Sequence, residues 1–459
     1  MALLTIISAG PSWLLTAQTR SAVVESSLDR STGERDASSN ERLSTVPPTL
    51  ARYFDPVQGI SAEDLVRRAL TSNGELAAAR LEIERAQARV RQAGLRPNPT
   101  LDLEQTTGRF TGSTDERETS VGIALPIELG SKRKRRIELA QAELEAVQAE
   151  VADRGRKLTL EVMSAYTEAL AALRELETTE NLNQLDLQTT RFVQARVNEG
   201  ESAPLELNLL RTEVDRLRSR RALIEGRLTT TFLKLKALAG ISDAEPMRLK
   251  EDLTTIRQPA PPQSVDAAIA IALRSRPDLR LLRLNEEVAE AGLRLARASA
   301  APDLTAFTRY SVGQSSFDDT PVGPIRDRDR LLTFGVSIGI PVFNRNQGAK
   351  AESAVAIAQA RTRREFLELV VRSEVQSAYA RYEAAQRAVT TFEQGVIARS
   401  NENIRVIRAA YQLGEFRITD LINEQRRLLD SQREFTEALT EQYRAFAELK
   451  VALGTPTNQ

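Results

Sequence analysis

The chain contains no cysteine and no histidine among its 459 residues. Their absence excludes thiol nucleophiles, disulfides, Cys/His metal sites and histidine acid–base catalysis. Lys+Arg and Asp+Glu both number 63, so the basic excess of a nucleic-acid-binding protein is missing. No glycine-rich phosphate loop is present. Paired carboxylates stay as one catalytic option, but no pair stands out, and we expect neither an enzyme nor a cofactor.

Long hydrophobic runs are also missing. No stretch of about 18 apolar residues exists, so the sequence predicts no transmembrane helix. Residues 1–18 are moderately apolar, but Pro11 interrupts them and no Lys or Arg precedes it. We interpret residues 1–55 as a signal-like segment followed by a flexible leader rich in Ser, Thr, Arg and Pro.

The second part of the chain repeats the pattern of the first. Glu161-Val162 and Ala165-Tyr166 correspond to Glu374-Val375 and Ala378-Tyr379. Other pairs follow in the same order, among them Leu70 with Leu273, Pro99 with Pro302, Gly200 with Gly414, and Leu207 with Leu421. An ordered series of matches predicts a duplicated, pseudo-symmetric chain. We expect repeats at 56–250 and 264–454, a linker at 251–263 and a tail at 455–459. The paired tyrosines, Tyr166 and Tyr379, are more typical of packing than of a site.

Each repeat predicts a helix, two strands, a very long helix, a tight turn and a closing helix. The predicted helices cover 61–95, 130–198 and 204–239, and then 264–300, 345–412 and 417–453. Apolar residues recur at spacings of three and four in the long helices. At ~1.5 Å per residue such a helix extends about 100 Å, which no compact domain holds. Periodicity alone leaves open a soluble antiparallel coiled coil.

Four segments alternate apolar residues with small or polar ones, which is typical of strands with one apolar face. The polar loops predicted within the two strand pairs are 108–117 and 313–329. The predicted lipid-facing residues are Val121, Ile123, Leu125, Leu332, Phe334, Val336, Ile338 and Ile340. Four strands cannot close a barrel, and an open edge is not tolerated in lipid. Two chains would supply eight strands and three would supply twelve. The alternative is two hairpins packed on a soluble domain.

This duplicated plan resembles the TolC-like outer-membrane efflux proteins, from about Ile60 to Gly454. The resemblance rests on the two turns between helices, Asn198-Glu199-Gly200 and Leu413-Gly414, and on Pro126 and Pro341 at the strand ends. The stretch Pro126-Ile127-Glu128-Leu129-Gly130-Ser131-Lys132-Arg133 resembles the branch that serves heavy-metal pumps of the cobalt–zinc–cadmium type. The resemblance implies a mainly α fold with a membrane β-barrel. Long antiparallel helices would form a trimeric tunnel, and four strands per protomer would give a 12-stranded barrel.

The resemblance further implies a homotrimer in the outer membrane of a Gram-negative-type cell, in contact with outer-membrane lipid and extending into the periplasm. It implies a periplasmic adaptor protein and an inner-membrane pump, of the RND type in preference to the ABC type. The interhelical turns would meet the adaptor. The residues expected at this periplasmic tip are Glu199, Gly200, Leu205, Glu206, Gly414, Asp420 and Leu421.

Carboxylates near the turns allow a second hypothesis. Glu206, Asp420 and Glu424, repeated by threefold symmetry, could form an aperture ring that favours cations. The alternative is that carboxylates in a first helical turn are ordinary partners of the helix dipole. Acidic residues in the loop 313–329 are a weak metal signal, and we interpret them as solvated.

Lys132 to Arg136 form a basic run where a long helix begins, an end that disfavours cations. The run could contact anionic groups at the membrane surface or simply be a solvated face.

The resemblance to the TolC-like proteins therefore implies the passive outer-membrane channel of a tripartite efflux system, exporting small solutes such as metal cations or drugs. The alternative is a non-channel coiled-coil scaffold of the cell envelope.

Overall fold

A computed structural model describes residues 50–110, 116–256, 260–317 and 325–454. The predicted signal-like segment, most of the leader, the tail 455–459 and the loop residues Asp318 and Asp319 lie outside these ranges. Within the described residues no helix is both long and apolar enough to cross a membrane.

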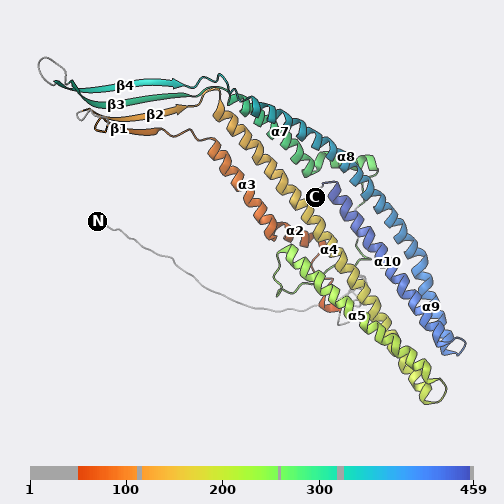
Figure 1. Cartoon of the computed structure of the whole chain (residues 1–459). Helices are drawn as coiled ribbons and strands as arrows, with labels where there is room; N and C mark the ends of the chain where they lie inside the picture. The colour runs from red at the N-terminus through yellow and green to blue at the C-terminus, as the bar shows by residue number, and fades with distance from the viewer. Residues whose placement is uncertain (1–49, 111–115, 257–259, 318–324, 455–459) are drawn as a thin grey trace, which may run out of the picture. The chain divides into compact units, whose positions relative to one another are not determined.

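The element order repeats (Figure 1). After a short 3₁₀ turn, η1 (Leu50–Arg52), the first series is α2 (Ala62–Ser72), α3 (Gly74–Ala93), β1 (Thr100–Thr107), β2 (Arg117–Ile127), α4 (Lys132–Asn198) and α5 (Pro204–Ala239). The second is α6 (Val265–Ser275), α7 (Pro277–Ala298), β3 (Leu304–Phe317), β4 (Ile325–Ile338), α8 (Gln347–Thr391), the π-helical turn η2 (Phe392–Val396), α9 (Ile397–Gln412) and α10 (Ile418–Ala452). The predicted order of elements is confirmed.

The helices predicted at 61–95 and 264–300 are each divided in two, so the prediction of continuous helices was wrong. The breaks lie at Asn73 and Arg276, whose backbones are extended. Asn73 caps α3, because its Oδ1 accepts from the Leu76 N–H at 2.9 Å. Arg276 precedes Pro277, and the residue before a proline is disfavoured in the helical conformation.

The two tyrosines related by the duplication make the same hydrogen bond in each repeat. Tyr166 of α4 donates to the Ile60 carbonyl and Tyr379 of α8 donates to the Pro262 carbonyl, both at 3.1 Å. Each hydroxyl therefore fixes the segment that leads into the first helix of its repeat. Burial raises the pKa of the Tyr166 hydroxyl, which stays a neutral donor. The interpretation of this pair as packing residues is confirmed.

Apolar clusters join helices that are distant in sequence. One cluster joins α6, α8 and the end of α10 through Ile269, Val375 and Leu449. A second, which we call the turn-side cluster, joins the ends of α4 and α9 to the starts of α5 and α10. Its buried members are Val193, Leu207, Leu210, Tyr411, Ile418, Leu421 and Ile422. The α4–α5 turn and the α9–α10 turn therefore lie at the same end of the helices.

Candidate functional site

The four strands form one antiparallel sheet in the order β1-β2-β3-β4. The register places Val121 opposite Tyr310 and Tyr310 opposite Leu332; likewise Ile123 is opposite Thr308, which is opposite Phe334. Directly opposed residues share a face of a sheet. One face therefore gathers most of the exposed apolar side chains of the strands: Leu101, Leu103, Val121, Ile123, Leu125, Tyr310, Leu332, Phe334, Val336 and Ile338.

The other face of the sheet carries mostly polar and small residues, with Phe307 and Leu331 as the large apolar exceptions. Asp102, Gly122, Arg309 and Thr333 lie in one cross-strand row. Arg309 forms an ion pair with Glu104 of β1 at 3.3 Å. A sheet that is apolar on one side and polar on the other fits a wall between lipid and water.

The sheet ends at β1 on one side and at β4 on the other, so each outer strand has one neighbour within the chain. An edge strand presents unpaired N–H and C=O groups, which hydrocarbon does not tolerate. A membrane sheet of this kind therefore needs further copies of the chain at both edges.

Two sequence predictions about the strands were wrong in extent. β4 ends at Ile338, so the predicted strand residue Ile340 lies beyond it, although its side chain is exposed. Pro341, which has no amide hydrogen, cannot extend the ladder. The loop predicted at 313–329 is shorter, because Gln314 pairs with Arg328 and Asp327 pairs with Ser315. The β3–β4 hairpin therefore extends through polar residues, because its pairing depends on backbone hydrogen bonds and not on apolar side chains.

The two interhelical turns have the same geometry. Gly200 has a φ of 79° and Gly414 has a φ of 83°, the left-handed region that glycine adopts without strain. Each glycine N–H bonds to a carbonyl three residues back, and the next N–H bonds to a carbonyl five residues back, in Glu201→Arg196 and Glu415→Ala410. This is the Schellman arrangement, in which the chain leaves a helix and reverses. Both glycines therefore permit the reversal at the two predicted tight turns.

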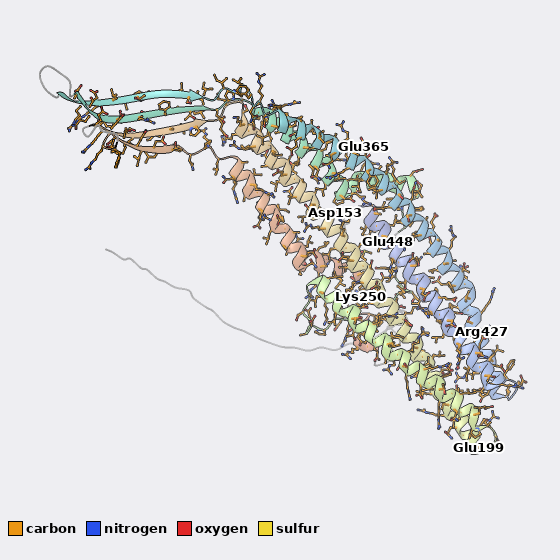
Figure 2. The ribbon with its side chains drawn as sticks, in the orientation of Figure 1. Asp153, Glu199, Lys250, Glu365, Arg427 and Glu448 are labelled. Carbon is orange, nitrogen blue, oxygen red and sulfur yellow. The ribbon has the colours of Figure 1, made fainter. Side chains whose placement is uncertain are left out.

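The predicted tip residues divide into exposed and buried ones. Glu199 lies at the end of the α4–α5 pair (Figure 2), and Leu205 is exposed beside it. Leu421 is only 1% exposed and belongs to the turn-side cluster. The prediction that its side chain contacts an adaptor was therefore wrong, because the protomer itself covers it. Sequence reasoning missed the exposed Leu413 and Phe416, apolar residues that flank the second turn glycine.

The three candidate aperture carboxylates have different surroundings. Glu206 accepts a long hydrogen bond from the Tyr411 hydroxyl at 3.4 Å, which connects the two turns. Burial, with the nearby charge of Glu206, raises the pKa of Tyr411 to about 12, so the hydroxyl remains a donor at neutral pH. Asp420 caps α10, since its carboxylate accepts from the Arg417 N–H at 3.0 Å. Asp420 therefore acts as a partner of the helix terminus, which was the alternative to the aperture ring.

Glu424 does not fit an aperture ring. Its side chain lies in the packing of α10, 6% exposed, and pairs with Arg427 at 3.4 Å. Further chains can only cover it more, whereas a residue that lines a lumen must be exposed in the protomer. The prediction for Glu424 was therefore wrong, and Glu206 and Asp420, which are half-buried, stay as candidates.

The basic residues at the start of α4 form ion pairs and hydrogen bonds with other residues of the same chain. Lys132 pairs with Asp303 at 2.7 Å, and Arg133 donates to the Gly94 carbonyl at 2.6 Å. Arg136 pairs with Glu128, and Arg135 with Glu138 at 2.7 Å. Lys132, Arg133 and Arg136 thus hold the junction between sheet and helices, a role that the sequence alone did not indicate, whereas Arg135 pairs within α4 itself.

Within the part of the chain that the structure describes, no group of three or more acidic residues is arranged to hold a metal ion. The acidic residues Asp327 and Asp329 are exposed on β4, in line with the interpretation of solvated carboxylates.

Comparison with known proteins shows that the two-repeat arrangement of sheet and long helices belongs to a known family. The family of outer membrane efflux proteins matches residues 65–241 and 268–455, which are most of both repeats. The chain belongs to the outer membrane efflux protein family. It is 23% identical over 402 residues to the cobalt-zinc-cadmium resistance protein CzcC of Cupriavidus metallidurans, covering 86% of this chain and 90% of CzcC.

Two further comparisons agree with this membership. The chain is 27% identical over 420 residues to the pyoverdine export outer membrane protein OpmQ of Pseudomonas putida, covering 86% of this chain and 84% of OpmQ. A crystal structure of CusC superposes with a TM-score of 0.71 at 20% identity, over 90% of this chain and 96% of that chain.

Family membership decides between the alternatives left open by the sequence. The protein is an outer-membrane efflux channel of the TolC-like type, located in the outer membrane and extending into the periplasm, and not a coiled-coil scaffold. Family members are channels, they form trimers, and they work with adaptor proteins and inner-membrane pumps. Three chains with four strands each give the twelve-stranded barrel, and the paired long helices form the tunnel.

Proposed function

We propose that this channel exports heavy-metal cations that an RND-type pump delivers through a periplasmic adaptor. The observation that carries the proposal is the stretch Pro126-Ile127-Glu128-Leu129-Gly130-Ser131-Lys132-Arg133, which resembles the cobalt–zinc–cadmium branch. It lies in a chain that is similar to CzcC over 86% of its length. The similarity to OpmQ makes small organic solutes the second candidate.

The proposed lipid contact is the exposed apolar face of the sheet, with Val121, Ile123 and Leu125 on β2 and Leu332, Phe334, Val336 and Ile338 on β4. The cross-strand register supports this assignment, since it groups these side chains on one face. Ile340, just beyond β4, would lie at the inner boundary of the bilayer. The proposed structural repeats remain 56–250 and 264–454.

The proposed adaptor contact is the turn-bearing end, with Glu199, Gly200, Leu205 and Gly414. Leu413 and Phe416 are added to it, because exposed apolar side chains that gather at one end of a molecule mark an interaction surface.

A substitution at each turn tests the adaptor contact. Leu205→Ser with Leu413→Ser is expected to weaken binding of the cognate periplasmic adaptor by about tenfold or more, because buried apolar anchors dominate such interfaces. Binding is measured by surface plasmon resonance on the detergent-purified trimer. The matched control is Leu223→Ser, an equally exposed leucine of α5 away from the turns. An unchanged Kd, or the same loss in the control, contradicts the contact.

We expect the channel to prefer cations because of the carboxylates of Glu206 and Asp420 at the turns. Glu206→Gln with Asp420→Asn keeps side-chain size and the α10 cap but removes two charges per protomer. The reversal potential in a salt gradient is expected to shift toward zero, because a ring of carboxylates concentrates cations. Glu437→Gln, on the exposed side of α10, serves as the control. If the reversal potential does not move, these residues do not form a selective aperture.

A further inference from the structure

A buried hydrogen bond joins the two repeats near the turn-bearing end. Asp186 of α4 is 2% exposed and Gln425 of α10 is 3% exposed. The Gln425 amide Nε2 donates to Asp186 Oδ1 at 2.6 Å. The carboxylate thus accepts from a neutral amide, although burial of a carboxylate is costly unless a cation or several donors compensate it.

The pair lies beside the turn-side cluster. Val193, a member of that cluster, is two helical turns from Asp186 along α4, and Ile422 is one turn from Gln425 along α10. Arg427, labelled on α10 in Figure 2, marks the same stretch of that helix. Any loosening of this pair therefore acts on the packing that holds the α9–α10 turn against the α4–α5 turn.

Charged groups reach this region from every neighbouring helix. Glu213 of α5 repels the carboxylate, while Arg408 of α9 attracts it. Glu213 is held by Arg426 of α10 and by Arg216 at 3.0 Å. Arg408 itself donates to Gln188 at 3.4 Å, and Glu424 is paired with Arg427. The two charges that act on Asp186 therefore oppose each other, and its protonation is governed mainly by its burial.

We propose that Asp186 and Gln425 form a protonation-dependent latch between α4 and α10. With a proton on Oδ2, the neutral carboxyl group packs in the interior while Oδ1 accepts from Gln425. Without the proton, a buried negative charge faces Glu213 and the contact between the helices weakens. The latch therefore holds in acid and loosens toward neutral pH. It rests on the proposed function only in treating the turn-bearing end as the mouth of the tunnel.

The pKa of Asp186 determines whether the packing of α10 against α4 is stronger in acid or at neutral pH. Burial, aided by Glu213, raises the pKa of Asp186 to about 6, against the opposing effects of Gln425 and Arg408. An acid whose pKa is raised in the packed state binds its proton more tightly there than in the opened state. The contribution to packing is therefore fully present below the ordinary pKa of 3.8, and it is lost as pH rises from there through about 6.

Hydrogen exchange of α10 tests the latch directly, in the full-length trimer in detergent. Peptides covering 418–430 are compared between the wild type and Asp186→Asn, at about pH 3.5 and about pH 7.5. Asparagine imitates the neutral carboxyl group and cannot ionise. At the higher pH the wild type is expected to exchange about tenfold faster than the variant, and at the lower pH the two should agree within about twofold.

Two further variants sharpen the result. Gln425→Leu removes the donor that favours the ionised form, so the pH at which α10 loosens should rise. Asp215→Asn, an exposed residue of α5 paired with Arg218 at 3.2 Å, should leave exchange of α10 unchanged. Equal exchange of the wild type and Asp186→Asn at both pH values overturns the proposal, as does a midpoint that Gln425→Leu does not move. The readout requires no conduction, so it can fail while the transport function holds, or hold while that function fails.

Discussion

Replacing Phe334 with arginine is expected to abolish stable insertion of the protein in the outer membrane. Phe334 is exposed near the middle of the apolar run of β4, in the cross-strand row with Thr308 and Ile123. Arginine on the lipid face near the bilayer midplane costs about 2–4 kcal/mol. The cost applies once per protomer, so a trimer bears it three times. Membrane fractionation and detergent extraction, followed by native mass measurement, detect the loss.

The neighbouring residue provides the control for this experiment. Thr333 lies in the row with Arg309, on the polar face of the sheet. Thr333→Arg introduces the same side chain one position away, yet it should leave insertion intact because the residue faces water. If both variants insert, or both fail, the assignment of the two faces is wrong.

Arg276→Met is expected to lower the free energy of unfolding by about 3–5 kcal/mol, the typical cost of breaking a buried ion pair. Arg276 is 3% exposed, between α6 and α7, and contacts Asp278 at 2.5 Å and Glu374 of α8 at 2.6 Å. Arg156 of α4 reaches the same Asp278 at 3.3 Å. Removing the guanidinium leaves a carboxylate of this network poorly compensated. Thermal unfolding of the purified trimer measures the effect.

An exposed ion pair gives the matched comparison. Arg433 and Glu437 pair at 3.0 Å on the surface of α10, where an ion pair contributes about 0–1 kcal/mol. Arg433→Met should therefore change the melting temperature little. Equal effects at positions 276 and 433 would show that the joint at Arg276 is not a stabilising network.

The ion pairs around Arg276 also predict how the stability of the protein depends on pH. Burial alone would raise the pKa of Asp278, but the hydrogen bond and charge of Arg276, with the charge of Arg156, outweigh it and lower the pKa below 3.8. A lowered pKa contributes stability that is present above the unfolded value and is lost as pH falls through the folded one. The wild type should therefore lose this contribution in acid, and Arg276→Met should lose less.

The sequence predicted the features that follow from local chemistry and repetition. Gly200 and Gly414 marked the reversals because their conformation is unfavourable for other residues. The alternation around Val121 and Phe334 marked the apolar face because successive strand residues point to opposite sides. The duplication then extended each assignment from one repeat to the other.

Features that depend on tertiary packing could not be predicted in this way. Leu421 and Glu424 lie near the exposed turn in sequence, but the helix rotates them into the interior, and only their burial in the structure reveals this. Both helix breaks, by contrast, had visible signals that the prediction of continuous helices passed over: Pro277 after Arg276, and the Asn73-Gly74 pair, since asparagine is a preferred N-cap. The Asp186–Gln425 bond joins residues 239 positions apart, and no local pattern announces it.

Single-channel recording in a planar bilayer tests the central claim most directly. The detergent-purified wild-type trimer is added to one side of the membrane and the current is followed at fixed voltage, with Phe334→Arg protein as the negative control. We predict discrete, reproducible conductance steps from the wild type and from Asp420→Asn. Absence of steps from both of these trimers, each confirmed as inserted, would contradict the account of this protein as a transmembrane conduit.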